Sequence, residues 1–171
     1  MPPIYIMEKL WSPWRSAYID SFKSEKTENN CIFCNAINED ISSVNSLLIK
    51  KFEHTLVMLN LYPYNSGHLL IVPKRHTSDF LTLSDEELLE VNRVTKLSIT
   101  ALKQIMNPNG INYGANLGKA AGAGIEDHIH FHIVPRWIGD SNFMPVLGEV
   151  KVISQDLLDT KKKLIEAFAI L

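Results

Sequence analysis

The chain has 171 residues, of which 46% are hydrophobic and 21% are charged, and its net charge is −2. These values are typical of a globular domain with enough chain to bury a sizeable core, and they argue against a basic surface that binds a nucleic-acid polymer. No run of about 18 apolar residues is present, so we expect no membrane span.

Residues 1–30 are predicted to form an amino-terminal arm and linker ahead of the main domain at residues 31–171. The arm carries an aromatic-rich segment, Trp11–Tyr18, which we expect to dock on the core or on a neighbouring subunit rather than on a substrate. Residues 23–30 are polar and typical of a linker. The arm lacks the apolar core of a signal peptide, so we expect a cytoplasmic location and reduced cysteines.

Cys31 and Cys34 follow the linker with the spacing Cys-x-x-Cys. This spacing is compatible with a redox pair, half of a zinc site or two buried cysteines. A redox pair needs a βαβ context, which the polar linker does not favour. A tetrahedral zinc site needs two further ligands, and histidine suits zinc. The candidate ligands are His54, His68, His76 and one histidine of the later cluster.

Three strand candidates come next, at residues 46–51, 55–59 and 68–72, and Pro73 ends the third. Their short connections favour an antiparallel sheet. The basic residues Lys74 and Arg75 are interpreted as a solvated strand end.

A capping box then begins a long helix, with Ser84 as the cap and Glu87 three residues later. Apolar residues at helical spacing continue to about Met106, where an Asn-Pro-Asn-Gly sequence ends the helix.

The remaining elements are predicted as a strand over residues 111–117, a small-residue loop over 118–124, a histidine-rich strand, a short strand near 150–153 and a final helix capped by Ser154. The order of strands, helix and further strands indicates an α+β fold.

Three histidines, His128, His130 and His132, alternate with bulky apolar residues. An alternation of period two indicates a strand with all three imidazoles on one face. Adjacent buried imidazoles need polar partners, which a metal, a phosphate or a catalytic role would supply. The loop just before them contains three glycines and three alanines, so its backbone N–H groups could approach a phosphate. Imidazole is largely neutral and nucleophilic near pH 7.

The stretch His128–Val134 resembles the His-φ-His-φ-His-φ-φ motif of the histidine triad superfamily of nucleotide hydrolases and transferases. Supporting motifs are Asn60, Gly67-His68, Pro73-Lys74-Arg75-His76 and Asn116-Leu117-Gly118. Three segments that flank these motifs are similar to the bacterial branch related to diadenosine tetraphosphate phosphorylases. These segments are Leu10–Arg15, Val134–Trp137 and Gly139–Met144.

The resemblance implies a five-stranded antiparallel sheet with a long central helix and a C-terminal helix, in a homodimer or larger homo-oligomer. It also implies that His130 attacks the α-phosphorus of a diadenosine polyphosphate and forms a nucleotidyl-histidine intermediate. His132 and His68 would support this step. Water or inorganic phosphate would then release the nucleotide.

The resemblance further implies binding roles. Asn60 would bind the ribose, Phe33 and Met58 would line the base pocket, and Trp137 would stack on a base or simply pack. The phosphate contacts would come from Asn116, Gly122, Ala123 and Gly124. A structural zinc ion would be held by Cys31, Cys34, His76 and His128, and no organic cofactor is expected.

The resemblance leaves the acceptor and the substrate open. Ala123 and Gly124 stand where hydrolase members often carry Gln, Ser or Thr, and the loop has one or two more residues before His128 than in some members. The acceptor could therefore be water or phosphate. An adenosine phosphoramidase or aminoacyl-adenylate hydrolase would use the same residues. A nucleotide-binding module with vestigial catalysis is a third alternative, against which the intact His130 argues.

Overall fold

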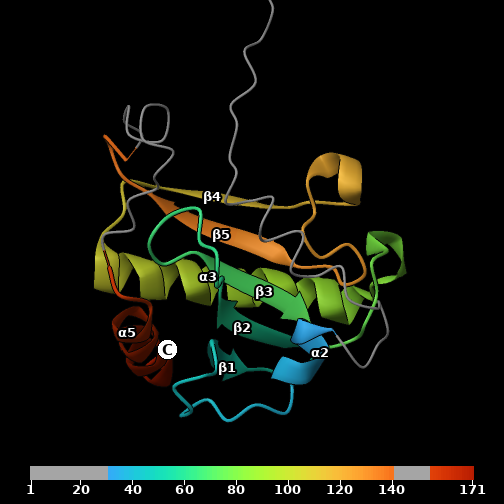
Figure 1. Cartoon of the computed structure of the whole chain (residues 1–171), viewed down its shortest axis with the longest axis horizontal. Helices are drawn as coiled ribbons and strands as arrows, with labels where there is room; N and C mark the ends of the chain where they lie inside the picture. The colour runs from blue at the N-terminus through green and yellow to red at the C-terminus, as the bar shows by residue number, and fades with distance from the viewer. Residues whose placement is uncertain (1–30, 141–154) are drawn as a thin grey trace, which may run out of the picture.

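Five strands form one antiparallel sheet in the spatial order β1-β2-β3-β5-β4 (Figure 1). The computed structural model describes residues 31–140 and 155–171. Its strands are β1 (Leu48–Lys51), β2 (Thr55–Leu59), β3 (Leu69–Pro73), β4 (Gly110–Ala115) and β5 (Phe131–Arg136). Its helices are α2 (Ile32–Ala36), α3 (Asp85–Met106) and α5 (Leu157–Ala169), with 3-10 turns η2 (Phe80–Thr82) and η3 (Lys119–Ala121). The predicted α+β fold, with a long central helix and a C-terminal helix, is confirmed.

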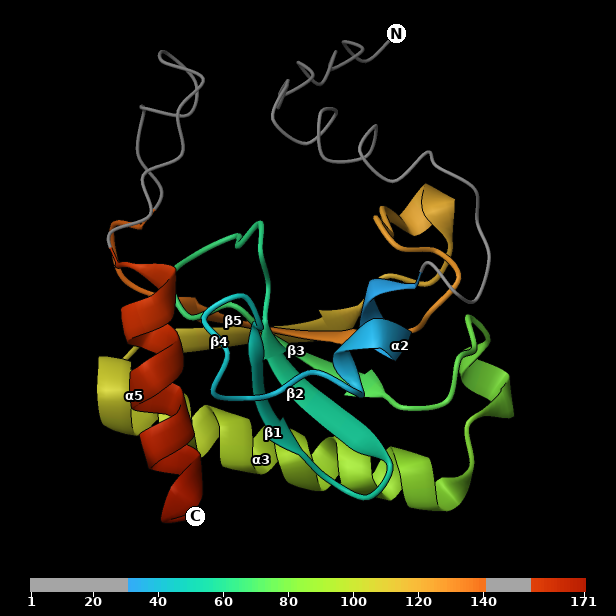
Figure 2. The ribbon, with the colours of Figure 1, turned by 60° about the horizontal axis from the view of Figure 1, so that its bottom comes forward.

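Different helices cover the two faces of the sheet, as Figure 2 shows. The long helix α3 and the C-terminal helix α5 bury one face, and the short helix α2 packs on the other. On the α2 side, the strand registers align Leu48, Met58, Leu70 and His132 in one row across four strands. This row places an imidazole next to the apolar surface on which Phe33 of α2 packs.

The period-two pattern of the histidine stretch correctly predicted its two faces. Ile129, Phe131 and Ile133 belong to the core beneath the sheet on the α3 side. His128 and His130 contact the ring of Phe33 on the α2 side. The strand itself begins only at Phe131, so His128 and His130 lie in the segment that leads into β5.

The capping box at the start of α3 is present, and it also anchors the loop after β3. The Ser84 hydroxyl accepts from the Glu87 N–H, and the Glu87 carboxylate accepts from the Ser84 N–H. The guanidinium of Arg75 donates to both Glu87 oxygens, at 3.0 and 2.7 Å. Arg75 is exposed, as predicted for a solvated strand end, but it also forms an ion pair that the sequence did not predict, because the fold brings this carboxylate to it.

We expect Glu87→Gln to lower the free energy of unfolding by about 1–2 kcal/mol at pH 7, since it weakens both the cap and the bidentate ion pair. Hydrogen bonds from Arg75 lower the pKa of Glu87 below its ordinary value of 4.5. A lowered pKa contributes stability that is complete above pH 4.5 and is lost as the pH falls through the pKa of the folded protein. Urea unfolding at pH 7 and pH 3 should therefore show the difference between wild type and variant shrinking in acid. An unchanged difference at pH 3 would contradict the assignment.

Several predicted boundaries shift in the structure. The third strand includes Pro73, which pairs with Thr55, and the strand predicted at 111–117 spans Gly110–Ala115. The N-cap of α5 is Asp156, which accepts from two backbone N–H groups, so the prediction of Ser154 as the cap was wrong. The predicted arm and the short strand near 150–153 lie outside the described residues. No described helix has the length and hydropathy needed to cross a bilayer.

Candidate active site and metal centre

A pocket of about 670 Å³, including its open mouth, lies on the α2 side of the sheet. Its apolar wall comes from α2 and from the strand row, and includes Ile32, Phe33, Met58, Leu70 and Ile125. Its polar wall is formed by Asn60, Tyr62, Tyr64, Asn116, His130 and His132 together with Gly122 and Gly124. This combination of an apolar wall and a small number of convergent polar groups is typical of a small-molecule site.

His130 is placed so that one ring nitrogen is occupied and the other can react. Its Nδ1–H donates to the backbone carbonyl of His128 at 2.9 Å, which leaves the lone pair on Nε2. The side chain is buried, and desolvation lowers its pKa below the ordinary imidazole value. His130 is therefore neutral near pH 7, as a nucleophilic nitrogen must be.

His68 and His132 form a hydrogen-bonded pair whose tautomers follow from their neighbours. The backbone N–H of Tyr64 donates to His68 Nδ1 at 3.0 Å, so the proton of His68 lies on Nε2. That Nε2–H donates to His132 Nδ1 at 2.9 Å. A neutral His132 therefore carries its proton on Nε2, as a donor beside His130, whose ring centroid lies 4.9 Å away. This arrangement suits a residue that holds a phosphate oxygen or a leaving group.

The turn before β3 fixes these two histidines. Asn60 contacts His68 Nδ1 through its side-chain amide, and its Oδ1 accepts from the Tyr62 N–H. The ring of Tyr64 stacks on His132, with centroids 5.8 Å apart. Gly67 has a φ of +74°, and a Cβ there would lie 2.5 Å from the sulfur of Met106 at the end of α3. A side chain at position 67 would therefore disturb the entry to His68.

The small-residue loop forms one wall of the pocket. Asn116, Gly122 and Gly124 line it, and the Asn116 amide donates to the Gly122 carbonyl at 3.4 Å. Gly118 and Gly122 both have positive φ, which a glycine adopts without strain. Ala123 is buried and does not line the pocket.

Trp137, unlike Ala123, is separated from the pocket by the length of a strand. It follows the last residue of β5, whereas His130 precedes the first, so roughly 20 Å of strand separates them. Its backbone N–H donates to Asp140, which also accepts both bonds of the Arg136 fork. Within one chain Trp137 belongs to this turn.

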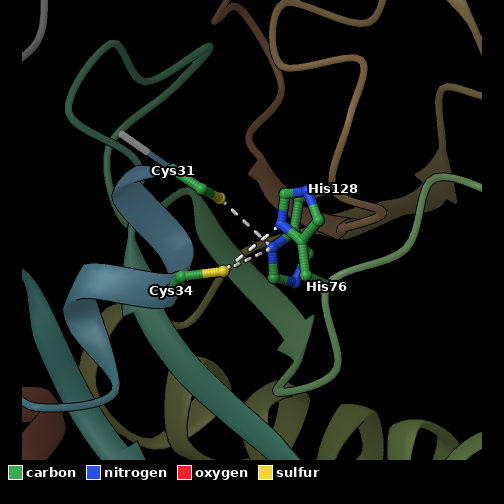
Figure 3. Close-up of side chains that lie close together, drawn as sticks. All are labelled: Cys31, Cys34, His76 and His128. Atoms are coloured by element: carbon green, nitrogen blue, oxygen red, sulfur yellow. Dashed lines mark hydrogen bonds between the residues drawn. The ribbon is translucent and has the colours of Figure 1, made fainter. Parts of the chain in front are cut away.

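Four predicted metal ligands, Cys31, Cys34, His76 and His128, converge beside the pocket (Figure 3). The distance from Cys31 Sγ to His128 Nδ1 is 3.3 Å, and the distances from Cys34 Sγ to the Nδ1 atoms of His76 and His128 are 3.3 and 3.6 Å. The four residues come from the start of α2, the loop after β3 and the segment before β5.

This geometry fits a tetrahedral zinc ion. Zn–S bonds of about 2.3 Å and Zn–N bonds of about 2.0 Å place sulfur and nitrogen ligands about 3.5 Å apart. The Nε2–H of His128 donates to the Pro73 carbonyl at 2.7 Å, so its Nδ1 lone pair faces the two cysteines. Burial, above all, lowers the pKa of His128 to about 4, which keeps this lone pair unprotonated near pH 7. Four protein ligands would leave no open position, so the ion would be structural.

The other zinc candidates are placed elsewhere. His54 lies with Glu53 and Glu90, on the turn between β1 and β2, and His68 is bonded to His132. Cys31 and Cys34 lie at the start of α2 and do not form a disulfide. Of the alternatives that the sequence left open, the half zinc site is the one that the geometry favours.

Several lining residues were missed by sequence analysis, notably Leu61, Tyr62, Tyr64 and Ile125. Tyr64 could have been found from its position four residues before His68, across a turn that contains Pro63. The helix α2 gave no sequence signal, since five residues carry too little periodicity.

Comparison with known proteins agrees with this fold and site. Residues 42–137, more than half of the chain, match the model of the HIT domain family. A protein of Mycobacterium tuberculosis named AP-4-A phosphorylase is 36% identical over 166 residues, which cover 95% of this chain and 85% of that protein.

Solved structures show the same likeness. A zinc-bound histidine triad family protein from Mycobacterium smegmatis has a TM-score of 0.66 and 28% identity, covering 83% of this chain and 95% of that one. A hypothetical histidine triad nucleotide-binding protein from Sulfolobus tokodaii also has a TM-score of 0.66, with 27% identity, covering 82% of this chain and 93% of that one.

Proposed function

Because this chain belongs to the HIT domain family, we propose that it cleaves diadenosine polyphosphates at the α-phosphorus through a nucleotidyl-histidine intermediate on His130. The observation that carries the proposal is the tautomer of His130. Its Nδ1–H is held by the His128 carbonyl, and its Nε2 lone pair belongs to a residue that lines the pocket.

The proposed reaction has two balanced steps. His130 Nε2 attacks the α-phosphorus, a nitrogen–phosphorus bond forms, and the bond from phosphorus to the bridging oxygen breaks. The leaving nucleoside polyphosphate keeps the electron pair of that bond. In the second step water or inorganic phosphate attacks the same phosphorus and His130 leaves. AMP results with water, and ADP results with phosphate.

The residues around His130 would each bind a different part of the substrate. Phe33 and Met58 supply the apolar slot for a base, and Asn60 would contact the ribose. Asn116 with the loop backbone at Gly122–Gly124 would hold phosphate oxygens. His132, kept in its Nε2–H tautomer by His68, would donate to a phosphate or leaving oxygen. The name of the Mycobacterium tuberculosis relative supports phosphate as the acceptor.

The test is product analysis with diadenosine tetraphosphate, with and without inorganic phosphate. We expect ATP in both cases, together with ADP when phosphate is present and AMP when water is the acceptor. A product of two ADP molecules without phosphate would contradict attack at the α-phosphorus. Preferential turnover of an AMP phosphoramidate would favour the phosphoramidase alternative. Tight AMP binding without turnover of either substrate would favour a vestigial binding module.

We also propose that residues 31–171 form the histidine triad domain, that the cysteine–histidine cluster holds a structural zinc ion, and that the protein forms a homodimer. Support for the dimer comes from β4, an edge strand that is largely exposed and carries the half-exposed Tyr113. Such an edge offers backbone groups to a second sheet. A molar mass of one chain in solution would contradict the dimer.

A further inference from the structure

Lys119 is the one cationic side chain between residues 104 and 135. It begins η3, in the middle of the loop that lines the pocket. We propose that Lys119 is a specificity-determining residue that selects substrates whose leaving group is a multiply charged polyphosphate. This inference rests on the proposed function and names the substrate feature that the same site would recognise.

The first support is the electrostatic character of the pocket. Its sixteen lining residues include no Lys, Arg, Asp or Glu. Neutral amides and backbone N–H groups can hold the phosphate that is attacked. A tetraphosphate carries further negative charges beyond that phosphate, and these need a cation or water.

The second support is the position of Lys119 within the loop. Asn116 lies three residues before it and Gly122 three residues after it, and both line the pocket. The Gly122 N–H donates to the Lys119 carbonyl at 2.9 Å, so the turn is closed and the backbone of Lys119 is fixed beside the pocket wall. A lysine side chain about 6 Å long can reach phosphates that extend past this wall.

The third support is the state of the Lys119 side chain. It is exposed, and within the described parts of the chain its ammonium makes no ion pair. Glu126 and Asp127 follow later in the same loop, and neither lines the pocket. An ammonium on a flexible stem that no carboxylate holds is suited to bind a mobile, variably extended polyphosphate.

Most of the other described Lys and Arg side chains are bound to protein groups or lie on the opposite face of the sheet. Those in hydrogen bonds or ion pairs with the protein are Lys50, Lys51, Arg75, Arg136 and Lys161. Those on α3 or α5, the helices of the opposite face, include Arg93, Lys96, Lys103, Lys162 and Lys163. The backbone N–H of Lys74 donates to the carbonyl of His54 in the turn between β1 and β2, and Lys74 does not line the pocket. Figures 1 and 2 instead show η3 at the same end of the sheet as α2, which forms the apolar pocket wall.

The chemistry of the leaving group makes the distinction measurable. When the bond to the bridging oxygen breaks, a polyphosphate leaves with an additional negative charge, which a nearby ammonium stabilises. An amine that leaves from a phosphoramidate needs a proton instead, and Lys119 would contribute little. The positive charge of Lys119 therefore favours substrates with a polyphosphate leaving group, without any change in His130.

The experiment compares wild type with Lys119→Gln, Lys119→Arg and the control Lys103→Gln, which removes an exposed charge from α3. For each protein, kcat/KM is measured for diadenosine tetraphosphate and for an AMP phosphoramidate with an uncharged amine. We expect Lys119→Gln to lower kcat/KM about ten-fold for the tetraphosphate, the order of one partly screened charge pair, and to leave the phosphoramidate within about two-fold. Arginine should restore most of the loss, and the control should match wild type.

Binding separates this inference from the proposed catalysis. Wild type should bind ATP more tightly than AMP, and Lys119→Gln should lose most of that preference, with a smaller effect at high salt. If wild type turns over neither substrate, the proposed function fails, and the ratio of the ATP and AMP Kd values still decides the role of Lys119. An equal effect of Lys119→Gln on both substrates, or an unchanged Kd ratio, would overturn the inference.

Discussion

Replacement of His130 by alanine is expected to lower the turnover of diadenosine tetraphosphate by at least about 10³-fold, because it removes the nucleophile and leaves no other neutral imidazole in its position. AMP binding should stay within a few fold of wild type, since Asn60, Phe33 and the loop backbone remain. The variant should therefore lose kcat far more than affinity. A loss of affinity alone would point to a binding role for His130.

A chemical quench sharpens this test. Wild-type protein denatured during turnover should carry a nucleotidyl group that is stable in base and labile in acid, as expected for a phosphorus–nitrogen bond. Peptide mapping should place that group on His130. His132→Ala, in which the nucleophile is intact, should still form the adduct more slowly. Adduct on His132, or turnover by His130→Ala within ten-fold of wild type, would rule out the proposed mechanism.

The matched control is His54→Ala. His54 is a partly exposed histidine on the turn between β1 and β2, and it does not line the pocket. Its replacement should leave turnover and adduct formation unchanged. A similar loss in this variant would mean that the effect of His130→Ala reflects stability rather than chemistry.

Cys34→Ser is expected to abolish zinc binding and to lower the unfolding midpoint by about 10 °C or more. Cys34 contacts both metal-site histidines, so its loss would disconnect the two halves of the cluster. Structural zinc binding can contribute on the order of 10 kcal/mol of apparent free energy, and a loss of 1 kcal/mol shifts the midpoint by roughly 2–4 °C in a domain of this size. This domain keeps an independent core, so we expect destabilisation rather than complete unfolding.

Metal analysis and thermal unfolding check this expectation together. Wild type should contain about one zinc per chain, and wild type treated with a chelator should melt close to Cys34→Ser. The chelator should have no effect on the variant itself. A zinc content far below one per chain, with both cysteines reduced, would remove the zinc assignment.

The metal site should also affect catalysis indirectly. The carbonyl of His128 accepts the Nδ1–H of His130, and His128 is itself a proposed zinc ligand. Loss of zinc would free this segment and disturb the tautomer of His130. We therefore expect Cys34→Ser to lower kcat as well.

The sequence by itself determined the elements whose cause is local. The capping box at Ser84 fixed the start of α3, and the apolar spacing carried it to Met106. The bounds of β2, Thr55–Leu59, were predicted without error from a short apolar run, and all five residues are buried. The alternation around His130 determined which side chains share a face, since the period of an extended chain is set by covalent geometry.

The tertiary structure decided what depends on contacts between distant residues. Sequence spacing left His54, His68, His76 and the triad histidines as possible partners for Cys31 and Cys34. The packing of α2 against the sheet is what brings His76 and His128 to the two cysteines. The same holds for Arg75, whose partner Glu87 lies on another element, and for Trp137, which the length of β5 separates from the pocket. The spacing of residues along the chain predicts the periodicity of a single element. The choice among distant partners depends instead on the strand order of the sheet, which places β5 next to β3 although a long stretch of chain separates them.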